Sequence, residues 1–276
     1  MDLALLLITV LLGQEVAGLE LLRINVPPYS LRGKSALLEC RYDLQEDKLY
    51  SISWYKDHEE FYRYVPRGEP PQHSYRVEGV KVDHGRSDHQ QVLLQNVSLH
   101  SSGQYRCEVS AEAPSFHSVS AEASMEVVVL PQEGPTITGE EKVYASGDVL
   151  SLNCTSGKSR PAANLKWFIN GAQNWRRTRS VACSFQVKPD TKMVFDHHGL
   201  YSVISSLRLD LEPNHITGDK INVRCEATVE LDSNSDAPLI ETRTTEVFVE
   251  GQASVATPSV YLTLATALIL RLASLA

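Results

Sequence analysis

Four of the five cysteines in this chain are placed to form covalent cross-links. Cys40 and Cys107 each lie in a stretch where apolar and polar residues alternate, and so do Cys154 and Cys225. Alternate side chains of a β-strand point to one face, so each of these cysteines would face an apolar core. In an oxidising compartment two such cysteines pair as a disulfide. We therefore predict the disulfides Cys40–Cys107 and Cys154–Cys225.

The residues between the first two cysteines indicate the fold. Trp54 lies in a third alternating stretch, Tyr50 to Lys56, whose inward residues we predict to be Tyr50, Ile52 and Trp54. Tyr105 precedes Cys107 by two positions. A cysteine, a tryptophan about a dozen residues later and a Tyr-x-Cys stretch are typical of an immunoglobulin sandwich, in which the tryptophan packs on the disulfide and the tyrosine hydroxyl ties a corner.

The second half of the chain repeats this pattern with one departure. Trp167 follows Cys154 and precedes Cys225, but the corner position holds Val223, so the hydroxyl tie is not expected. The predicted fold class is all-β, with two tandem immunoglobulin-like β-sandwiches. The first is variable-type because of its extra middle strands, and the sequence leaves the type of the second undecided.

The remaining reactive residues give no catalytic pattern. The chain has nine histidines, but His197 and His198 are adjacent and would face opposite sides of a strand. We find no zinc-protease motif, paired Cys-x-x-Cys or nucleophile elbow. The net charge of −8 argues against nucleic-acid binding. We therefore expect no enzymatic activity, no cofactor, no metal site and no nucleic-acid partner.

Composition along the chain predicts its organisation. Residues 1–18 resemble a signal peptide, with an apolar stretch too short to span a bilayer and cleavage after Gly18. Residues 19–130 form the first domain, the proline-bounded stretch 131–135 is a linker that holds the domains roughly end to end, and residues 136–250 form the second domain.

The last stretch, residues 251–276, predicts attachment to the membrane. Small uncharged residues are followed by an apolar tail without a basic cluster, which is typical of a glycosylphosphatidylinositol anchor signal. The candidate attachment sites are Gly251, Ala253 and Ser254. A single membrane-spanning helix is the alternative, and Arg271 within the tail weakens the anchor interpretation. Either one predicts a chain tethered to the outer face of the plasma membrane.

Two asparagines and one unpaired cysteine are candidates for modification. Asn96 and Asn153 each begin an N-glycosylation sequon, although the cysteine after Asn153 favours poor use of that site. Cys183 has no predicted partner, so it is either a buried small apolar residue or a thiol available for an intermolecular disulfide.

The predicted partner-binding surface lies on the first domain. If Trp54 points inward, Tyr55 points outward, and alternation exposes at least one aromatic residue of the next strand. Exposed aromatics with arginine are typical of interface cores. The alternative is that these tyrosines are ordinary solvent-facing residues. The candidate residues are Tyr55, Phe61, Tyr62, Tyr64, Arg106, Glu108 and Phe116.

Several stretches resemble the beaten path family of neuronal proteins with two immunoglobulin domains. The stretches Tyr-Lys-Asp at 55–57 and Ala-Glu-Ala-Pro-Ser-Phe at 111–116 are the most specific, since the fold does not require them. Further stretches that carry the resemblance are Leu22–Pro27, Ala36–Cys40, Glu60–Pro66, Ser101–Cys107 and Asn153–Gly157.

This resemblance implies a function that composition and spacing do not. It implies a cell-surface receptor in axon guidance and synaptic partner choice, which binds a sidestep-family protein on another cell. Together with the surface predicted above, the leading hypothesis is that this protein is bound through the first domain. A homophilic adhesion molecule or a structural co-receptor subunit is the alternative that the residues leave open.

Overall fold

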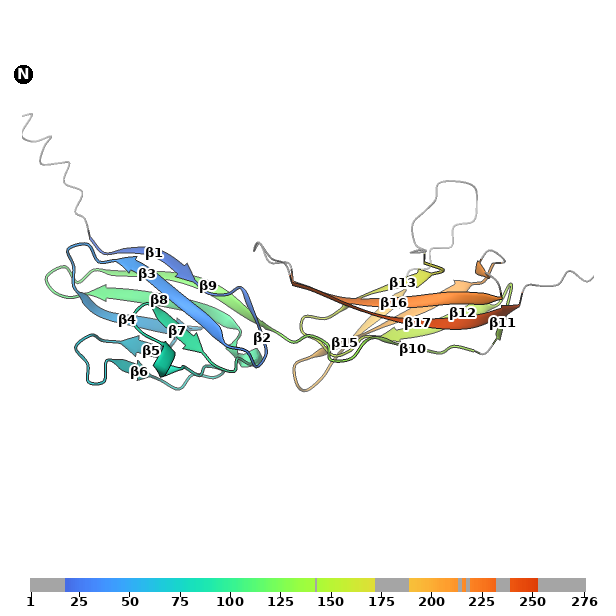
Figure 1. Cartoon of the computed structure of the whole chain (residues 1–276), viewed down its shortest axis with the longest axis horizontal. Coiled ribbons are helices and arrows are strands. Elements are labelled where there is room, and N and C mark those ends of the chain that lie inside the picture. Colours follow the sequence, from blue (N-terminus) through green and yellow to red (C-terminus); the bar gives the residue numbers. More distant parts are fainter. Residues whose placement is uncertain are drawn as a thin grey trace, which may run out of the picture.

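A computed structural model describes residues 18–141, 143–171, 189–212, 215–216, 219–231 and 239–252. Two β-sandwiches follow one another along the long axis of the molecule (Figure 1). The first sandwich comprises strands β1 to β9, and the second comprises β10 to β17.

The first domain pairs a three-stranded sheet with a six-stranded one. The smaller sheet has the order β1-β3-β7 and the larger has the order β2-β9-β8-β4-β5-β6. The strands of the smaller sheet are β1 (Glu20–Asn25), β3 (Ala36–Asp43) and β7 (Gln91–Leu94). Those of the larger are β2 (Tyr29–Leu31), β4 (Leu49–Lys56), β5 (Glu59–Tyr64), β6 (Gln72–Ser74), β8 (Gly103–Ala111) and β9 (Ser118–Val128).

The core of the first domain forms where the two sheets face each other. The disulfide Cys40–Cys107 joins β3 to β8, as the alternation predicted, with its Cα atoms 6.3 Å apart. Trp54 is opposite Cys107 in the pairing of β4 with β8 and is almost completely buried. Burial of such large apolar side chains supplies most of the stabilisation of a sandwich this size.

The predicted tyrosine corner is present in the first domain. The hydroxyl of Tyr105 donates a hydrogen bond of 2.6 Å to the backbone carbonyl of Ser101, in the short helix η2 (Leu99–Ser101). The Ser101 side chain is itself buried, donates to the carbonyl of Gly79 and accepts from the Ser98 amide. Burial raises the pKa of Tyr105, so the hydroxyl stays protonated and remains a donor.

The second domain consists of two four-stranded sheets, with the orders β10-β12-β15-β14 and β11-β17-β16-β13. The strands of the first of these are β10 (Thr136–Thr138), β12 (Val149–Thr155), β15 (Tyr201–Asp210) and β14 (Asp190–Phe195). Those of the second are β11 (Val143–Ala145), β17 (Leu239–Gln252), β16 (Lys220–Leu231) and β13 (Asn164–Ile169).

The second core has a disulfide and a tryptophan arranged as in the first, but it is held by a different side-chain hydrogen bond. The disulfide Cys154–Cys225 joins β12 to β16, and Trp167 is opposite Cys225 in the pairing of β13 with β16. The indole Nε1 of Trp167 donates to the buried hydroxyl of Ser205, 3.0 Å away. This hydrogen bond satisfies the polar atom of the indole, which would be costly to bury without a partner.

The two domains touch beside the linker. Val129 and Arg160 exchange a pair of backbone hydrogen bonds of 2.9 Å each, so the end of the first domain is tied to the loop after β12. Leu99 of η2 faces Gly199, where an added Cβ would lie 3.1 Å from the Leu99 Cδ1 atom. Because Gly199 has a φ of +79°, a side chain there would also be strained.

Several predictions fall partly or wholly outside the described residues. These are the signal peptide up to residue 17, Cys183, and the attachment candidates Ala253 and Ser254. Gly251 is described, and its burial makes it the least favourable of the three attachment candidates. It lies buried in β17, paired with Tyr144, and its amide donates to the Asp219 carbonyl. Among the described residues, none of the helices has the length and apolar character needed to cross a membrane.

Candidate functional site

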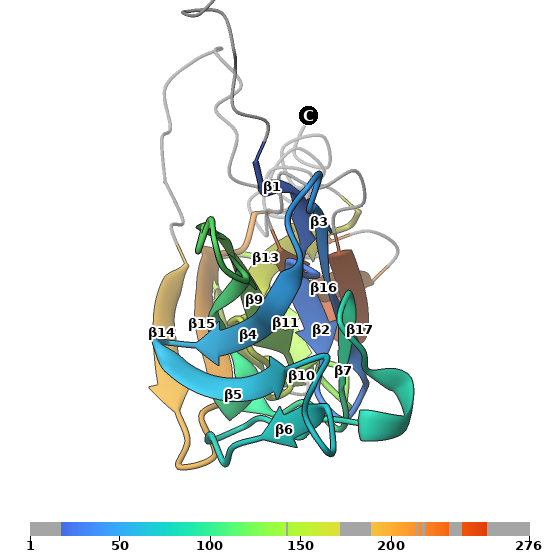
Figure 2. The same ribbon diagram turned by 90° about the vertical axis from the view of Figure 1, so that its left-hand side faces the viewer.

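The outward face of the large sheet in the first domain carries several charged side chains. We call Tyr55, Arg63, Arg106, Glu108 and Glu122 the charged face. Figure 2 looks along the molecule from the first domain and has β4, β5 and β6 of this sheet towards the viewer. Strand registers place Tyr55 beside Arg106, and Arg106 beside Glu122. The neighbouring row places Ser53 between Arg63 and Glu108.

Arg106 lies at the centre of the charged face. Its guanidinium lies over the Tyr55 ring, 4.3 Å from the centroid, which is a cation–π geometry. Glu108 approaches its Nη1 at 3.7 Å and Glu122 its Nε at 4.0 Å. The buried Nε has no hydrogen-bond partner among the described residues, so the two carboxylates compensate its charge without bonding to it. The side chain is therefore fixed by stacking and by charge.

A second ion pair on this face lies on the strand next to Tyr55. Arg63 donates from Nε and Nη2 to the two carboxylate oxygens of Glu60, at 2.6 and 2.8 Å. These hydrogen bonds raise the pKa of Arg63. The bidentate geometry fixes the planar guanidinium against Glu60.

Phe61 and Tyr62 are not on this face, so their prediction as partner-binding residues is wrong. Both side chains are completely buried in the core. A register shift between Trp54 and Tyr55 places Phe61 in a bulge, where it packs edge-on against Tyr105. Strict alternation cannot anticipate such a shift. Tyr64 is half-buried against the same core, with its ring 5.6 Å from that of His89.

Exposed aromatic residues gather instead at the end of the first domain that is farthest from the linker. We call Tyr50, Arg67, Glu112 and Phe116 the tip surface. Phe116 is 74% exposed and Tyr50 is 57% exposed. Both line a cavity of about 530 Å³ together with Arg67 and Glu112, which form an ion pair of 2.9 Å. The backbone of Phe116 has a φ of +52°, a conformation that is costly for a large side chain.

Sequence reasoning missed Tyr50 as a surface residue. Alternation from Trp54 predicted that it faces the core, but a register shift between Leu49 and Ser51 turns it outward. Arg67 and Arg63 were also missed, because a single arginine in a loop or strand carries no signal of its own.

The second domain repeats the stacked arginine at the equivalent position. Arg224 lies over the Phe168 ring at 4.3 Å and approaches Glu246 at 4.0 Å. The registers match as well, since Phe168 is opposite Arg224 and Arg224 is opposite Glu246. An aromatic, an arginine and a glutamate on three adjacent strands therefore form a repeated structural unit. This repetition means that the stack alone does not mark a binding site.

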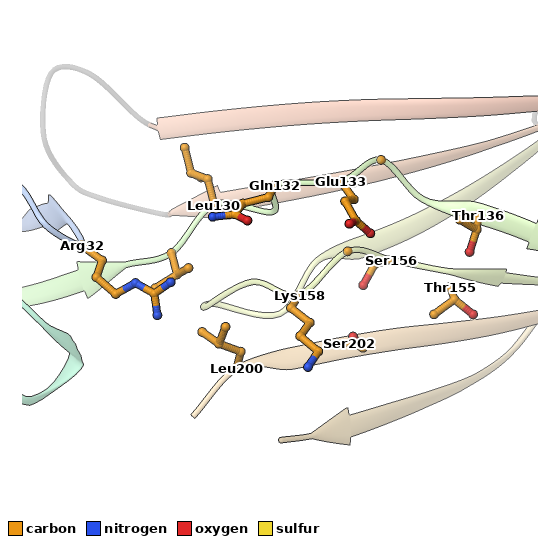
Figure 3. Close-up of a pocket in the computed structure, with 13 residues that line it drawn as sticks. Arg32, Leu130, Gln132, Glu133, Thr136, Thr155, Ser156, Lys158, Leu200 and Ser202 are labelled. Carbon is orange, nitrogen blue, oxygen red and sulfur yellow. The ribbon is translucent and has the colours of Figure 1, made fainter. Parts of the chain in front are cut away.

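A further cavity lies at the domain junction. It has a volume of about 430 Å³ and is lined by Arg32 of the first domain, by the linker and by the second domain (Figure 3). Lys158, on its wall, pairs with Asp196 at 2.9 Å. The Leu200 amide and Lys158 together lower the pKa of Asp196 to about 2. These contacts organise the turn before β15, which lies against the first domain.

Both predicted glycosylation sites are at the surface. Asn96 is exposed at a turn after β7, with a φ of +49°. Asn153 is exposed on β12, but its side-chain oxygen accepts a 2.6 Å hydrogen bond from Ser206. A glycan attached to Asn153 would therefore project outward from the middle of the sheet.

The described part of the chain contains no cluster of three or more histidine, cysteine or acidic side chains able to hold a metal ion. Within the described residues, the Ser74 hydroxyl contacts the Nε2 atom of His84 at 2.8 Å. The other ring nitrogen faces the Gln72 amide oxygen at 3.1 Å and not a carboxylate, so the third member of a catalytic triad is replaced by a neutral amide.

Comparison with known families identifies both domains. Residues 28–130 match the immunoglobulin V-set domain, and residues 130–236 match the CD80-like C2-set immunoglobulin domain. The chain is thus all-β and consists of a V-set domain followed by a C2-set domain. The type of the second domain, which the sequence left undecided, is therefore C2-set.

Among curated relatives, the chain is 27% identical over 155 residues to cell adhesion molecule 3 of Xenopus laevis, covering 52% of this chain and 36% of that protein. It is 26% identical over 141 residues to human cell adhesion molecule 2, covering 51% of this chain and 29% of that protein. It is 27% identical over 198 residues to the CD276 antigen homolog of Xenopus laevis, covering 68% of this chain and 59% of that protein. The chain therefore spans less than two thirds of the length of each of these relatives.

Solved structures confirm the tandem arrangement of folds. The crystal structure of Rst D1-D2 superposes with a TM-score of 0.53 at 18% identity, covering 86% of this chain and 100% of that one. The crystal structure of murine CEACAM1b superposes with a TM-score of 0.52 at 17% identity, covering 84% of this chain and 100% of that one. Identities this low establish likeness of fold alone.

Proposed function

We propose that this chain of two immunoglobulin domains is a cell-surface recognition receptor that binds another cell-surface protein in trans through its first domain. The observation that carries the proposal is the tip surface, where Phe116 and Tyr50 stand exposed around a cavity bounded by the Arg67–Glu112 ion pair. Large exposed aromatics beside arginine are the usual anchors of protein interfaces. The sequence similarity to cell adhesion molecules supports the same class of function.

The partner that we propose is a protein of the sidestep family, and the proposed role is in axon guidance and synaptic partner choice. The support is the resemblance of this chain to the beaten path family. Two of the stretches that carry it, residues 55–57 and 111–116, contribute Tyr55 to the charged face and Glu112 and Phe116 to the tip surface. The charged face, with Arg106 and Glu108, would select the partner by charge complementarity.

We further propose that the chain is held on the outer leaflet by a glycosylphosphatidylinositol anchor attached at Ala253 or Ser254. The support is the small-residue stretch and apolar tail of residues 251–276. Treating intact cells that express the full chain with a phosphatidylinositol-specific phospholipase should release it. A chain that stays on the cells after this treatment would favour the membrane-spanning alternative.

The binding proposal is tested with cells that display the full chain. Tagged extracellular regions of sidestep-family proteins are added, and bound label is measured on wild-type cells and on cells displaying Phe116→Asp at equal surface level. We expect saturable binding to at least one of them, lost in the variant. Absence of binding across the family would overturn the proposed partner. Aggregation of cells that express only this chain would instead favour the second candidate, homophilic adhesion.

A further inference from the structure

The amino-terminal end of the described chain is tied to a carboxylate at the tip of the first domain. The backbone nitrogen of Leu19 donates a hydrogen bond of 3.3 Å to the Oδ2 atom of Asp47. The Leu19 side chain is buried and is part of the hydrophobic core of the first domain. Leu19 is thus held at both its nitrogen and its side chain, and its nitrogen cannot move far from Asp47 without exposing apolar surface.

Asp47 is the meeting point of three segments. Its Oδ1 accepts a hydrogen bond of 2.5 Å from the Ser115 hydroxyl, and its Oδ2 lies 3.6 Å from the Nδ1 atom of His117. Ser115 and His117 belong to the loop between β8 and β9 and flank Phe116. The Asp47 side chain is only 15% exposed, although it carries a charge. Its two oxygens therefore face one neutral donor, one backbone amide and one histidine.

The negative charge of this carboxylate is met by two hydrogen bonds and one histidine. His117 is the one titratable group that faces Asp47 within ion-pair distance in the described chain, and it is charged only when protonated. The hydrogen bond from Ser115 outweighs the effect of burial and, with the Leu19 amide and His117, lowers the pKa of Asp47, so the carboxylate is ionised and able to pair with a cation. The Leu19 nitrogen, which already contacts Oδ2, is the atom at which a positive charge would compensate it best.

We propose that the chain is cleaved between Gly18 and Leu19 and that the ammonium group of Leu19 forms a structural ion pair with Asp47. A secretory endopeptidase would hydrolyse this peptide bond: the oxygen of water goes to the new carboxylate of Gly18, and the Leu19 nitrogen takes up protons to become an ammonium. The hydrogen bond from an amide then becomes a charge-assisted one, which is shorter and stronger. Asp47 acts as a positioning residue that joins the new amino terminus to the loop carrying Phe116.

This inference does not depend on the proposed partner, and it has its own measurement. The full chain is expressed in secretory cells and purified, and its amino terminus is sequenced. The pKa of the terminal amine is then obtained from the pH dependence of its rate of acylation, followed by mass spectrometry. The matched variants are Asp47→Asn and Glu46→Gln, because Glu46 is an exposed carboxylate one residue away.

The expected results are a start at Leu19 and a raised pKa of its amine. An ordinary α-amino group has a pKa of about 7.7 to 8.0. An ion pair that raises this pKa by about half to one unit slows acylation at neutral pH about 3- to 10-fold. Asp47→Asn should abolish this slowing, while Glu46→Gln should keep it. If Asp47→Asn fails to fold, wild-type protein in its native and denatured states provides the same comparison.

Two results would overturn the proposal. One is a secreted chain that starts at a residue other than Leu19. The other is a terminal amine whose acylation rate is equal in the wild type and Asp47→Asn, or equal in native and denatured wild type. In that second case, any loss of partner binding in Asp47→Asn would be assigned to the loop that carries Phe116.

Discussion

The guanidinium of Arg106 stacks on the ring of Tyr55 at 4.3 Å, and the second domain contains the same stack between Arg224 and Phe168. The repetition provides a matched pair of substitutions. Each arginine bridges an aromatic residue on one neighbouring strand and a glutamate on the other. If only the first domain binds the partner, the two stacks should be equivalent for folding and different for recognition.

We predict that Arg106→Ala and Arg224→Ala lower the stability of their own domains by similar amounts, about 1 kcal/mol each, from the lost cation–π contact and packing. Arg106→Ala should weaken partner binding at least about 10-fold, as expected for an arginine at an interface. Arg224→Ala should leave binding unchanged. Thermal unfolding and titration of displayed protein with partner measure the two quantities. Equal losses of binding in the two variants would contradict a site confined to the first domain.

Phe116 tests the tip surface directly. We predict that Phe116→Asp reduces partner binding at least about 10-fold, because a charge replaces an exposed aromatic anchor. Stability should change by no more than about 0.5 kcal/mol, since the ring is solvent-exposed and aspartate tolerates the positive φ of this residue. The control is Phe248→Asp, because Phe248 is 65% exposed on β17 of the second domain. Binding that survives Phe116→Asp would exclude the tip surface.

The tyrosine corner should be measurable as a single hydrogen bond. Tyr105→Phe removes the hydroxyl that donates to the Ser101 carbonyl in a completely buried position. The carbonyl is left without that donor, so we expect the first domain to lose about 1 to 2 kcal/mol of stability. Tyr75→Phe, which removes a hydroxyl from an exposed side chain, should be nearly neutral. Chemical denaturation of both variants makes the comparison. Equal stabilities would mean that the corner bond contributes nothing net.

Asp196 should make the stability of the second domain depend on pH in the acid range. The Leu200 amide and Lys158 lower the pKa of Asp196 from 3.8 to about 2 in the folded chain. A carboxylate with a lowered folded pKa stabilises the fold above its unfolded pKa and loses that contribution as pH falls. The stability difference between wild type and Asp196→Asn should therefore be full above pH 4 and shrink between about pH 4 and pH 2. Denaturation at several pH values measures it, and a constant difference would contradict this assignment.

The sequence predicted the parts of the fold that depend on strong, short-range patterns. The two disulfides and both core tryptophans follow from residue type and parity, because a buried cysteine or indole tolerates few other places. The outward orientation of Tyr55 and Arg106 follows from the same parity.

The surface was harder to predict, because bulges change the side to which a residue points. One bulge turned Tyr50 outward and another turned Phe61 inward. Such shifts arise from packing across the whole sheet and leave no local mark on the sequence. The contact of Leu99 with Gly199 was likewise unpredictable, since it joins different domains that are far apart in the chain.

The strand β9 continues directly into the linker, and this continuity determines how the first domain would bear a mechanical load. β9 lies between the parallel strand β2 and the antiparallel strand β8. Hydrogen bonds between strands run across the strand direction, so a pull on Val128 from the linker strains both ladders in shear. Many bonds then resist together, where peeling would break them one at a time. If the tip surface holds a partner on another cell, as we propose, a force that separates the two cells would load the first domain along its most resistant direction.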